Sequence, residues 1–169
     1  MMPGEDSAGD FDAFVARYGA NGTFEWVRQF GTDLREFAVD VAATGSAAYI
    51  LGWTTADRKT FLRKYDQDGG LLWHRDTTLD QAKGVETDED GNAYVFGPSL
   101  TGEAVYIRRY DPHGGVDWTH SFPRRPFQEI GGLSVKGGRA AIAGLVIGKL
   151  PGQSRKGRED AFVRLLALP

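Results

Sequence analysis

Residues 65–73 have the sequence Tyr65-Asp66-Gln67-Asp68-Gly69-Gly70-Leu71-Leu72-Trp73, in which a glycine follows an aromatic residue by four positions and a tryptophan follows that glycine by four more. This spacing occurs three times in the chain: Tyr18, Gly22 and Trp26; Tyr65, Gly69 and Trp73; Tyr110, Gly114 and Trp118. Three copies of one motif indicate a repeat protein, in which each copy forms one supersecondary unit and neighbouring units stack.

Each copy of the motif is typical of a β-hairpin. A strand such as Phe61 to Tyr65 runs into a turn rich in Gly, Asp, Asn and Pro, and then into the strand that carries the tryptophan. We expect the glycines to adopt positive φ at the turn. Asp66 and Asp111 are expected to accept hydrogen bonds from the amides of their own turns. Each tryptophan is expected to pack between one sheet and the next, where a large aromatic side chain buries the most area.

The composition is that of a folded protein with frequent turns. Of the 169 residues, 41% are hydrophobic, 25% are charged and 23 are glycine, while amphipathic runs of helical length are missing. These features favour an all-β fold with short elements. The chain contains no cysteine, which excludes disulfides and thiolate sites for a metal or for catalysis, and leaves the redox compartment open.

Charge and hydropathy argue against two classes of partner. The net charge of −3 is too small to indicate a nucleic acid or a membrane surface. No apolar stretch reaches the roughly 18 residues that a membrane span requires. The N-terminus lacks the charged-then-apolar pattern of a signal peptide. If the parent protein is exported, we expect its export signal to lie outside this sequence.

The two ends of the chain resemble each other. Asp12-Ala13-Phe14-Val15 matches Asp160-Ala161-Phe162-Val163, and Met2-Pro3-Gly4-Glu5 matches Leu150-Pro151-Gly152-Gln153. Both pairs are 148 positions apart, which is the difference between 12 and 160 and between 2 and 150. Three repeat lengths fit this distance, and the mean period of about 49 residues is in the range of propeller blades.

The pattern predicts thirteen strands in three repeat units. Residues 1–11 form a polar N-terminal loop segment, and residues 12–169 hold the repeats, with units at 12–59, 60–104 and 105–159 and a closing strand at 160–169. Strands are expected near 13–18, 23–30, 37–43 and 47–53, near 60–65, 71–77, 82–88 and 92–98, near 105–110, 115–122, 130–136 and 139–146, and at 161–168. The fourth strand of each unit closes with a glycine: Gly52, Gly97 and Gly144.

Several linked motifs point to one family. They are the run Asp12-Ala13-Phe14-Val15-Ala16-Arg17-Tyr18, the Gly-x-x-x-Trp hairpin, the exit Gln29-Phe30-Gly31-Thr32, the hairpin from Asp88 to Gly97, and the loop Leu150-Pro151-Gly152-Gln153. Together they resemble the bacterial SBBP-type β-propeller repeat, over nearly the whole chain from about Pro3. The resemblance implies blades of four antiparallel strands, an extracellular or cell-surface location, and no defined reaction or cofactor.

The resemblance also implies an order of strands within each blade. The strands at Val39, Val85 and Leu133 would be innermost, and the tryptophan strands outermost. The sequence departs from the family pattern at Leu165-Leu166-Ala167-Leu168-Pro169, where an apolar run replaces the Arg-Tyr-Asp ending. We interpret this departure as the end of the chain.

Three units are too few for a closed propeller, because rings close with about four to eight blades. An open arc exposes apolar sheet faces and unpaired edge strands, which are templates for association. We therefore expect the chain to assemble with copies of itself, most simply as two chains with about six blades, or to be a fragment of a longer exported propeller protein. In the first case, the final strand of one chain would complete the blade begun by the first hairpin of another.

Candidates for calcium binding lie in the acidic turns. Asp66 and Asp68 in one hairpin, and Asp88 and Asp90 in another, supply oxygen atoms of the kind that Ca²⁺ prefers. They lack the full spacing of a calcium loop, and aspartate is common in hairpin turns because it hydrogen-bonds the turn itself. The structural interpretation is therefore favoured.

Candidates for catalysis are equally few. The only histidines are His74, His113 and His120, and those at 74 and 120 are expected to face opposite sides of corresponding strands, which argues against a shared metal site. No nucleophile motif occurs. We expect no metal, no cofactor and no enzymatic activity. Glu86, on an expected inner strand, is the one acid that a glycosidase or lyase hypothesis would test.

Basic residues next to aromatic residues form the candidate ligand site. It comprises Arg124, Arg125 and Phe127 in one connection and Arg155, Lys156 and Arg158 in the long third loop, both on the same rim if the family order holds. Arginine beside aromatic rings suits carboxylates, phosphates or sugars. The same loops contain Asp33, Glu36, Asp80, Glu129 and Glu159, so a solvated surface of mixed charge is the competing interpretation.

Three functional hypotheses follow. The first is a non-catalytic, self-assembling propeller that serves as a scaffold or interaction module. The second is a propeller that binds a glycan, another protein or an anionic partner through the arginine-rich rim. The third is an enzyme with paired carboxylates in a cleft, for which the sequence offers little.

Overall fold

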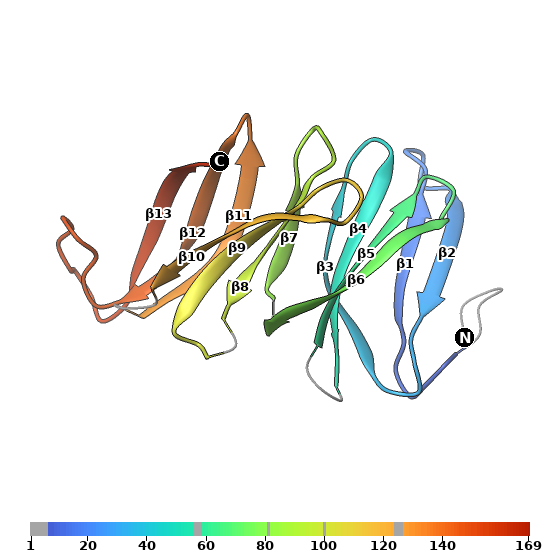
Figure 1. The fold of residues 1–169 in the computed structure, drawn as a ribbon, viewed down its shortest axis with the longest axis horizontal. Helices are drawn as coiled ribbons and strands as arrows, with labels where there is room; N and C mark the ends of the chain where they lie inside the picture. The colour runs from blue at the N-terminus through green and yellow to red at the C-terminus, as the bar shows by residue number, and fades with distance from the viewer. Residues whose placement is uncertain (1–6, 56–58, 81, 100, 124–126) are drawn as a thin grey trace.

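The computed structural model describes residues 7–55, 59–80, 82–99, 101–123 and 127–169, and the regular structure in these ranges is entirely β (Figure 1). The strands are β1 (Ala13–Tyr18), β2 (Phe24–Phe30), β3 (Glu36–Ala43), β4 (Ala47–Thr54), β5 (Lys59–Asp66), β6 (Leu71–Asp80), β7 (Gly84–Thr87), β8 (Ala93–Pro98), β9 (Ala104–Tyr110), β10 (Val116–Pro123), β11 (Phe127–Lys136), β12 (Arg139–Ile147) and β13 (Asp160–Ala167). All thirteen expected strands are present, each with bounds within three residues of the expected ones.

The strands pair into four antiparallel sheets. Sheet I has the order β1-β2, sheet II β3-β4-β5-β6, sheet III β7-β8-β9-β10 and sheet IV β11-β12-β13. The sheets are out of phase with the repeat units, because sheet II takes two strands from the first unit and two from the second. As a result, only sheets II and III have four strands among the described residues, and the sheets at the ends have two and three.

The four sheets stand side by side in the order of the sequence, with sheet I at one end of the row and sheet IV at the other (Figure 1). Strands β3, β7 and β11 lie along one side of the row, where β3 contacts β7 and β7 contacts β11. The tryptophan strands β6 and β10 form the opposite edges of sheets II and III. The row is open, because its two terminal sheets lie far apart.

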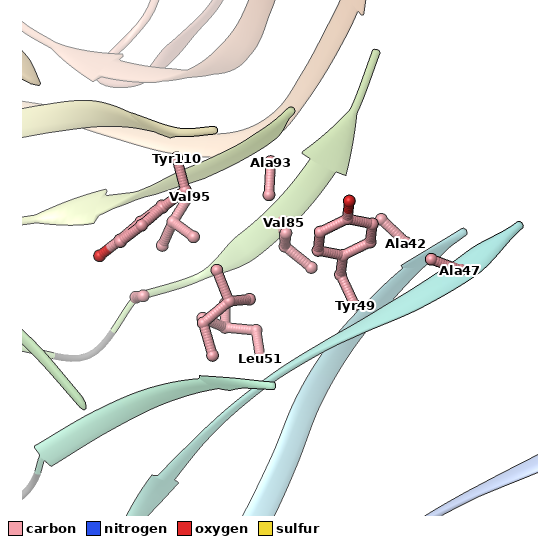
Figure 2. Close-up of a cluster of buried hydrophobic side chains, with 10 residues drawn as sticks. Ala42, Ala47, Tyr49, Leu51, Val85, Ala93, Val95 and Tyr110 are labelled. Atoms are coloured by element: carbon pink, nitrogen blue, oxygen red, sulfur yellow. The ribbon is translucent and has the colours of Figure 1, made fainter. Parts of the chain in front are cut away.

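Apolar side chains fill each space between neighbouring sheets. The core between sheets II and III includes Tyr49, Leu51, Leu62, Val85 and Val95, all nearly inaccessible to solvent (Figure 2). The core between sheets I and II includes Ala13, Val15, Phe30, Ile50, Phe61 and Tyr65. The core between sheets III and IV includes Phe96, Val105, Ile107, Leu133 and Ile142. The interior strands β4 and β8 are therefore apolar on both faces, because sheets II and III each have a neighbouring sheet on both sides.

Polar contacts also join sheets II and III. The Asp40 carboxylate on β3 accepts a hydrogen bond from the Val85 amide on β7, at 2.9 Å. The Tyr49 hydroxyl donates to the carbonyl oxygen of Gly91, in the turn between β7 and β8. Burial, together with the charge of Asp88, raises the pKa of Tyr49 to about 12, so its hydroxyl stays neutral and keeps its proton for this bond.

The hairpin turns have the conformation that the sequence predicts. Gly22, Gly69 and Gly114 have φ values of 81°, 79° and 80°, a region that glycine enters without steric cost. Asp66 accepts hydrogen bonds from the amides of Asp68 and Gly70, and Asp111 accepts from those of His113 and Gly115. The three turns therefore share one pattern of backbone hydrogen bonds and the same glycine conformation. Within the described ranges, no helix is long and apolar enough to cross a membrane.

Candidate functional site

The sheets are joined by a repeated arrangement that we call the carbonyl socket. In the first socket, the Trp26 indole N–H and the Arg17 guanidinium both donate to the carbonyl oxygen of Gln67, each at 2.7 Å. In the second, the Trp73 indole N–H and the Lys64 ammonium both donate to the carbonyl oxygen of Pro112, each at 2.9 Å. Each socket is formed by one sheet and holds the second residue of the next sheet's hairpin turn.

An arginine two residues after the tryptophan strengthens each of these contacts. Arg28 Nε donates to the Gly69 carbonyl oxygen at 2.9 Å, and Arg75 Nε donates to that of Gly114, also at 2.9 Å. Each guanidinium also lies over the ring of its tryptophan, 5.8 Å and 5.7 Å from the ring centroid. The sequence Trp-x-Arg therefore forms a clamp on the turn of the next sheet.

In the third socket, no carbonyl oxygen from the described part of the chain accepts a hydrogen bond. It would be formed by Trp118 and Arg109, but the buried Trp118 Nε1 and Arg109 Nε have no hydrogen-bond partner there. The nearest anion to Arg109 is Asp117, at 3.5 Å. His120 takes the place of the clamping arginine and packs against Phe122 instead. A buried N–H without an acceptor costs about 1–3 kcal/mol, so this site is poised to bind a carbonyl oxygen.

A second repeated contact pairs an aromatic ring with a glycine on the neighbouring strand. The register places Phe61 opposite Gly52, Tyr106 opposite Gly97, and Phe162 opposite Gly144. Phe61 and Tyr106 are only 3% and 2% exposed. A Cβ atom added at Gly52 would overlap the Phe61 ring, so the missing side chain is what lets the aromatic ring lie flat on the strand.

Phe14 is the fourth member of this series and has no such glycine. It lies on β1, whose only pairing among the named strands is with β2, and it is 51% exposed. A groove runs from Phe14 to β3, where Val39 and Val41 are also exposed. In sheets II and III, two further strands cover the corresponding edge. Sheet I therefore presents an apolar, unpaired edge of the kind that associates with another strand.

Sheet IV has the complementary defect. It contains β11, β12 and β13, and no described residues form a strand in the place that β6 and β10 take in the complete sheets. The outward face of β13 is apolar and open, since Val163 and Leu165 are each 75% exposed. Its other face is in contact with the core, where Phe162 and Leu166 pack against the cluster between sheets III and IV.

The residues predicted to bind a ligand are placed as follows. Arg124 and Arg125 lie outside the described residues, and Phe127 begins β11, with a side chain that is likewise outside the description. Its strand partner is Ile147, so the connections before β11 and after β12 leave sheet IV at the same end. Arg155, Lys156 and Arg158 lie exposed in the loop between β12 and β13.

That loop borders a pocket of about 490 Å³. Three cationic residues line it, Lys149, Arg155 and Arg164, together with Asp160 and Gln128. Arg155 Nε donates to the Gly157 carbonyl oxygen of its own loop, and Asp160 accepts from the amides of Lys156 and Gly157. Lys149 and Arg164 were not among the predicted ligand-binding residues, because their proximity depends on the path of the loop.

Comparison of the sequence with protein-family models and with curated proteins gives no match.

The acidic turns use their oxygen atoms internally. The Asp88 carboxylate accepts hydrogen bonds from the Asp90 and Asn92 amides, the Asn92 side chain and the Tyr94 hydroxyl. Burial disfavours its charged form, but these hydrogen bonds outweigh that effect and hold the pKa of Asp88 below its ordinary value. Among the described residues, no three His, Asp or Glu side chains gather as metal ligands.

Histidines and Glu86 likewise have individual surroundings. His74 Nε2 lies 2.7 Å from Asp76 Oδ1 on β6, whereas His120 is on β10. Burial, together with the charge of Asp40, raises the pKa of Glu86 on β7. Its nearest acidic neighbour on the adjacent sheet, Asp40, already binds the Val85 amide. These groups are explained by the packing of the sheets.

Proposed function

We propose that this chain is a non-catalytic β-propeller module of the SBBP type that assembles with copies of itself and serves as a scaffold. In this proposal each sheet is a blade, with β3, β7 and β11 innermost. The observation that carries it is that the row of sheets ends in two incomplete sheets, which together supply every strand position of a complete sheet and supply one position twice. Among the described residues, sheet I has no counterpart of the two inner strands, and sheet IV has no outer strand.

The strand count supports a dimer. One chain has two complete sheets and two partial ones. If the partial sheets of two chains combine pairwise, the assembly has four complete and two composite sheets. That total of six lies inside the range of about four to eight blades over which propellers close. The contact is head-to-tail, and two such contacts close a two-chain ring.

The non-catalytic assignment rests on how the polar groups are used. The carboxylates, arginines and tyrosines described above hold turns and join sheets, as Asp88, Arg75 and Tyr49 do. Glycosidase chemistry requires two carboxyl groups that face a substrate cleft. Among the described residues, the acid whose charge acts on Glu86 is Asp40, and Asp40 accepts a hydrogen bond from a backbone amide.

Sedimentation equilibrium on the full chain tests the proposal. We expect a species of twice the chain mass of 18.5 kDa at micromolar concentrations. Phe14→Asp places a charge on the unpaired edge of sheet I and should shift the protein to the monomer. The matched control is Leu72→Asp, a similarly exposed position on the outer strand β6, which should leave the dimer intact. A wild-type chain that is monomeric at every concentration contradicts the proposal.

A second candidate function is the binding of an anionic ligand or a sulfated or acidic glycan. The observation that favours it is the pocket beside the β12–β13 loop, with Lys149, Arg155 and Arg164 in its lining. Guanidinium groups recognise carboxylate, sulfate and phosphate groups by paired hydrogen bonds. The test is a calorimetric titration with a sulfated oligosaccharide, in which Arg155→Ala and Arg164→Ala should weaken binding. Arg139→Ala, an exposed position outside this pocket, is the control.

A further inference from the structure

Strands β1 and β13 hold the same position in their sheets. The same four-residue sequence, Asp-Ala-Phe-Val, occurs at residues 12–15 and 160–163. β13 pairs with β12 as β5 pairs with β4 and β9 with β8, and β1 is the equivalent partner of the tryptophan strand β2. One composite sheet therefore has room for β1 or for β13, but not for both. An assembly with this limit therefore differs from the expectation that the final strand completes the blade begun by the first hairpin of another chain.

We propose that β13 is an occluding strand, which the β1 strand of a second copy displaces from β12 when the chain assembles. The inference rests on the proposed function and specifies how its interface is made and controlled. The composite sheet is β11-β12 from one chain followed by β1-β2 from the other. It reproduces the order of sheet II, in which β3-β4 is followed by β5-β6.

The exchange supplies the glycine that Phe14 lacks. Phe162 lies opposite Gly144 in the present register. Since Phe14 corresponds to Phe162 in the repeat, β1 of a second copy places its ring on the same glycine. A residue that is 51% exposed in the single chain becomes buried, as Phe61 and Tyr106 are in the complete sheets.

The exchange also fills the empty carbonyl socket. Gln67 and Pro112, whose carbonyl oxygens occupy the first two sockets, each follow a repeat tyrosine by two positions. Ala20 stands at this position after Tyr18. Its turn has the same bonds as the others, with the Gly22 amide donating to the Gly19 carbonyl oxygen and the Gly19 amide to that of Thr23. The Ala20 carbonyl of the second copy therefore meets Trp118.

β13 does not lead to an acceptor for this socket, because its sequence departs from the repeat at the position of the repeat tyrosine. Leu166 replaces the repeat tyrosine, and the Leu168 amide donates to the Gly138 carbonyl oxygen instead of forming a hairpin turn. The sequence of β13 therefore matches that of β1 at the start of the segment that pairs with β12. It differs from β1 at the turn, which is the part that the socket of sheet III would hold. β13 covers the edge of β12 without completing the contact.

The β11-β12 hairpin also fits the groove beside β1. Val41 lies on the face of β3 opposite to Asp40, whose carboxylate reaches β7 in sheet III. Val39 lies at the β-bulge between Ala38 and Asp40 and lines the same groove as Val41. That exposed face is where the inner strand of the preceding sheet would lie, just as β7 covers the other face of β3. The inner strand β11 of the second copy takes this place and covers both valines.

The test uses identical substitutions in the two matching strands of the full chain. Phe14→Ala weakens only the incoming strand, so the dimer dissociation constant should rise by about tenfold or more. Phe162→Ala weakens only the occluding strand, so the dimer dissociation constant should fall, by up to about tenfold. Leu72→Ala on β6 is the control and should change neither. Circular dichroism verifies that each variant is folded, and Phe162→Leu provides a milder form of the second change.

The outcomes separate the inference from the proposed function. Opposite shifts for Phe14→Ala and Phe162→Ala support the exchange. A wild-type dimer whose dissociation constant is unchanged or raised by Phe162→Ala overturns the inference and leaves self-assembly standing. If the wild type is monomeric at every concentration, self-assembly itself fails.

Disulfide trapping gives a second, independent measurement, because the chain has no native cysteine. Ala143 is the cross-strand partner of Val163 in the register, so it becomes the partner of Val15 after exchange. Chains with Val15→Cys mixed with chains with Ala143→Cys should form a disulfide-linked pair on oxidation. In the control, the Ala143→Cys chains are mixed with chains that carry Val116→Cys, on the outer strand β10, in place of Val15→Cys. If the wild type dimerises but the Val15→Cys and Ala143→Cys chains form no cross-link, the exchange is contradicted.

Discussion

Trp26 donates its indole N–H to the carbonyl oxygen of Gln67, 2.7 Å away and 41 residues further along the chain. The same relationship joins Trp73 to Pro112, 39 residues further along. A contact between successive sheets is thus encoded within each repeat, since the donor strand and the acceptor turn both belong to the motif. The absence of an acceptor at Trp118, within the described residues, marks the place where the series stops.

The first prediction compares two tryptophans. Trp73→Phe removes a satisfied hydrogen bond to Pro112, whereas Trp118→Phe removes an indole N–H that has no acceptor among the residues that the structure describes. Trp73→Phe should therefore lower the free energy of unfolding by about 0.5–1.5 kcal/mol more than Trp118→Phe. Urea unfolding below the dimerisation concentration measures both. Equal losses would show that the socket hydrogen bond does not stabilise the fold.

The second prediction concerns the glycine beneath Phe61. A Cβ atom at Gly52 would overlap both the Phe61 ring and the Phe37 carbonyl oxygen. Gly52→Ala should lower the free energy of unfolding by about 1–3 kcal/mol, because the ring or the strand must move. Gly45→Ala is the matched control, since no atom lies within 4 Å of a Cβ there. A Gly52→Ala variant as stable as Gly45→Ala would contradict this account of the aromatic–glycine contact.

The third prediction concerns acid stability at Asp88. Its hydrogen bonds hold its folded pKa below the ordinary value of 3.8, so their stabilisation is present above that pH and is lost as the pH falls through the folded pKa. Asp88→Asn should lower the free energy of unfolding at pH 7 by about 1–2 kcal/mol. The difference from the wild type should shrink as the pH drops below about 4. A difference independent of pH would show that the charge is not involved.

The fourth prediction has the opposite sign. Burial raises the folded pKa of Glu86 above its ordinary value of 4.5, so stability is lost as the pH rises from that value through the folded pKa. Glu86→Gln should therefore be more stable than the wild type at pH 7, by up to about 1 kcal/mol, and equal to it at pH 4. Thermal unfolding at the two pH values measures this. Glu103→Gln, at an exposed position, serves as the control and should show no change.

Local features of the fold could be predicted from the sequence. Strand alternation gave all thirteen strands to within three residues. The positive φ of Gly69 and the turn hydrogen bonds of Asp66 follow from the chemistry of those residues alone. These features depend only on residues that are near one another in the chain, and for that reason the pattern contains them.

The grouping of strands into sheets could not be obtained in the same way. A repeat has the same period wherever its first residue is placed, so the pattern cannot show whether β5 pairs with β4 or begins a new sheet. The sockets were also missed, although the Trp-x-Arg spacing at Trp26 and Trp73 was present as a signal. The cationic pocket depends on the path of the long β12–β13 loop, and a path of this length is not fixed by contacts between residues that are near one another in the chain.

Native mass spectrometry of the full chain tests most directly whether two copies complete each other's terminal sheets. The account predicts that a species of two chains, each of 18.5 kDa, dominates at micromolar concentrations and dissociates on dilution. It also predicts that Phe14→Asp removes this species. A spectrum that contains only single chains at every concentration, or a dimer that Phe14→Asp leaves intact, would contradict it.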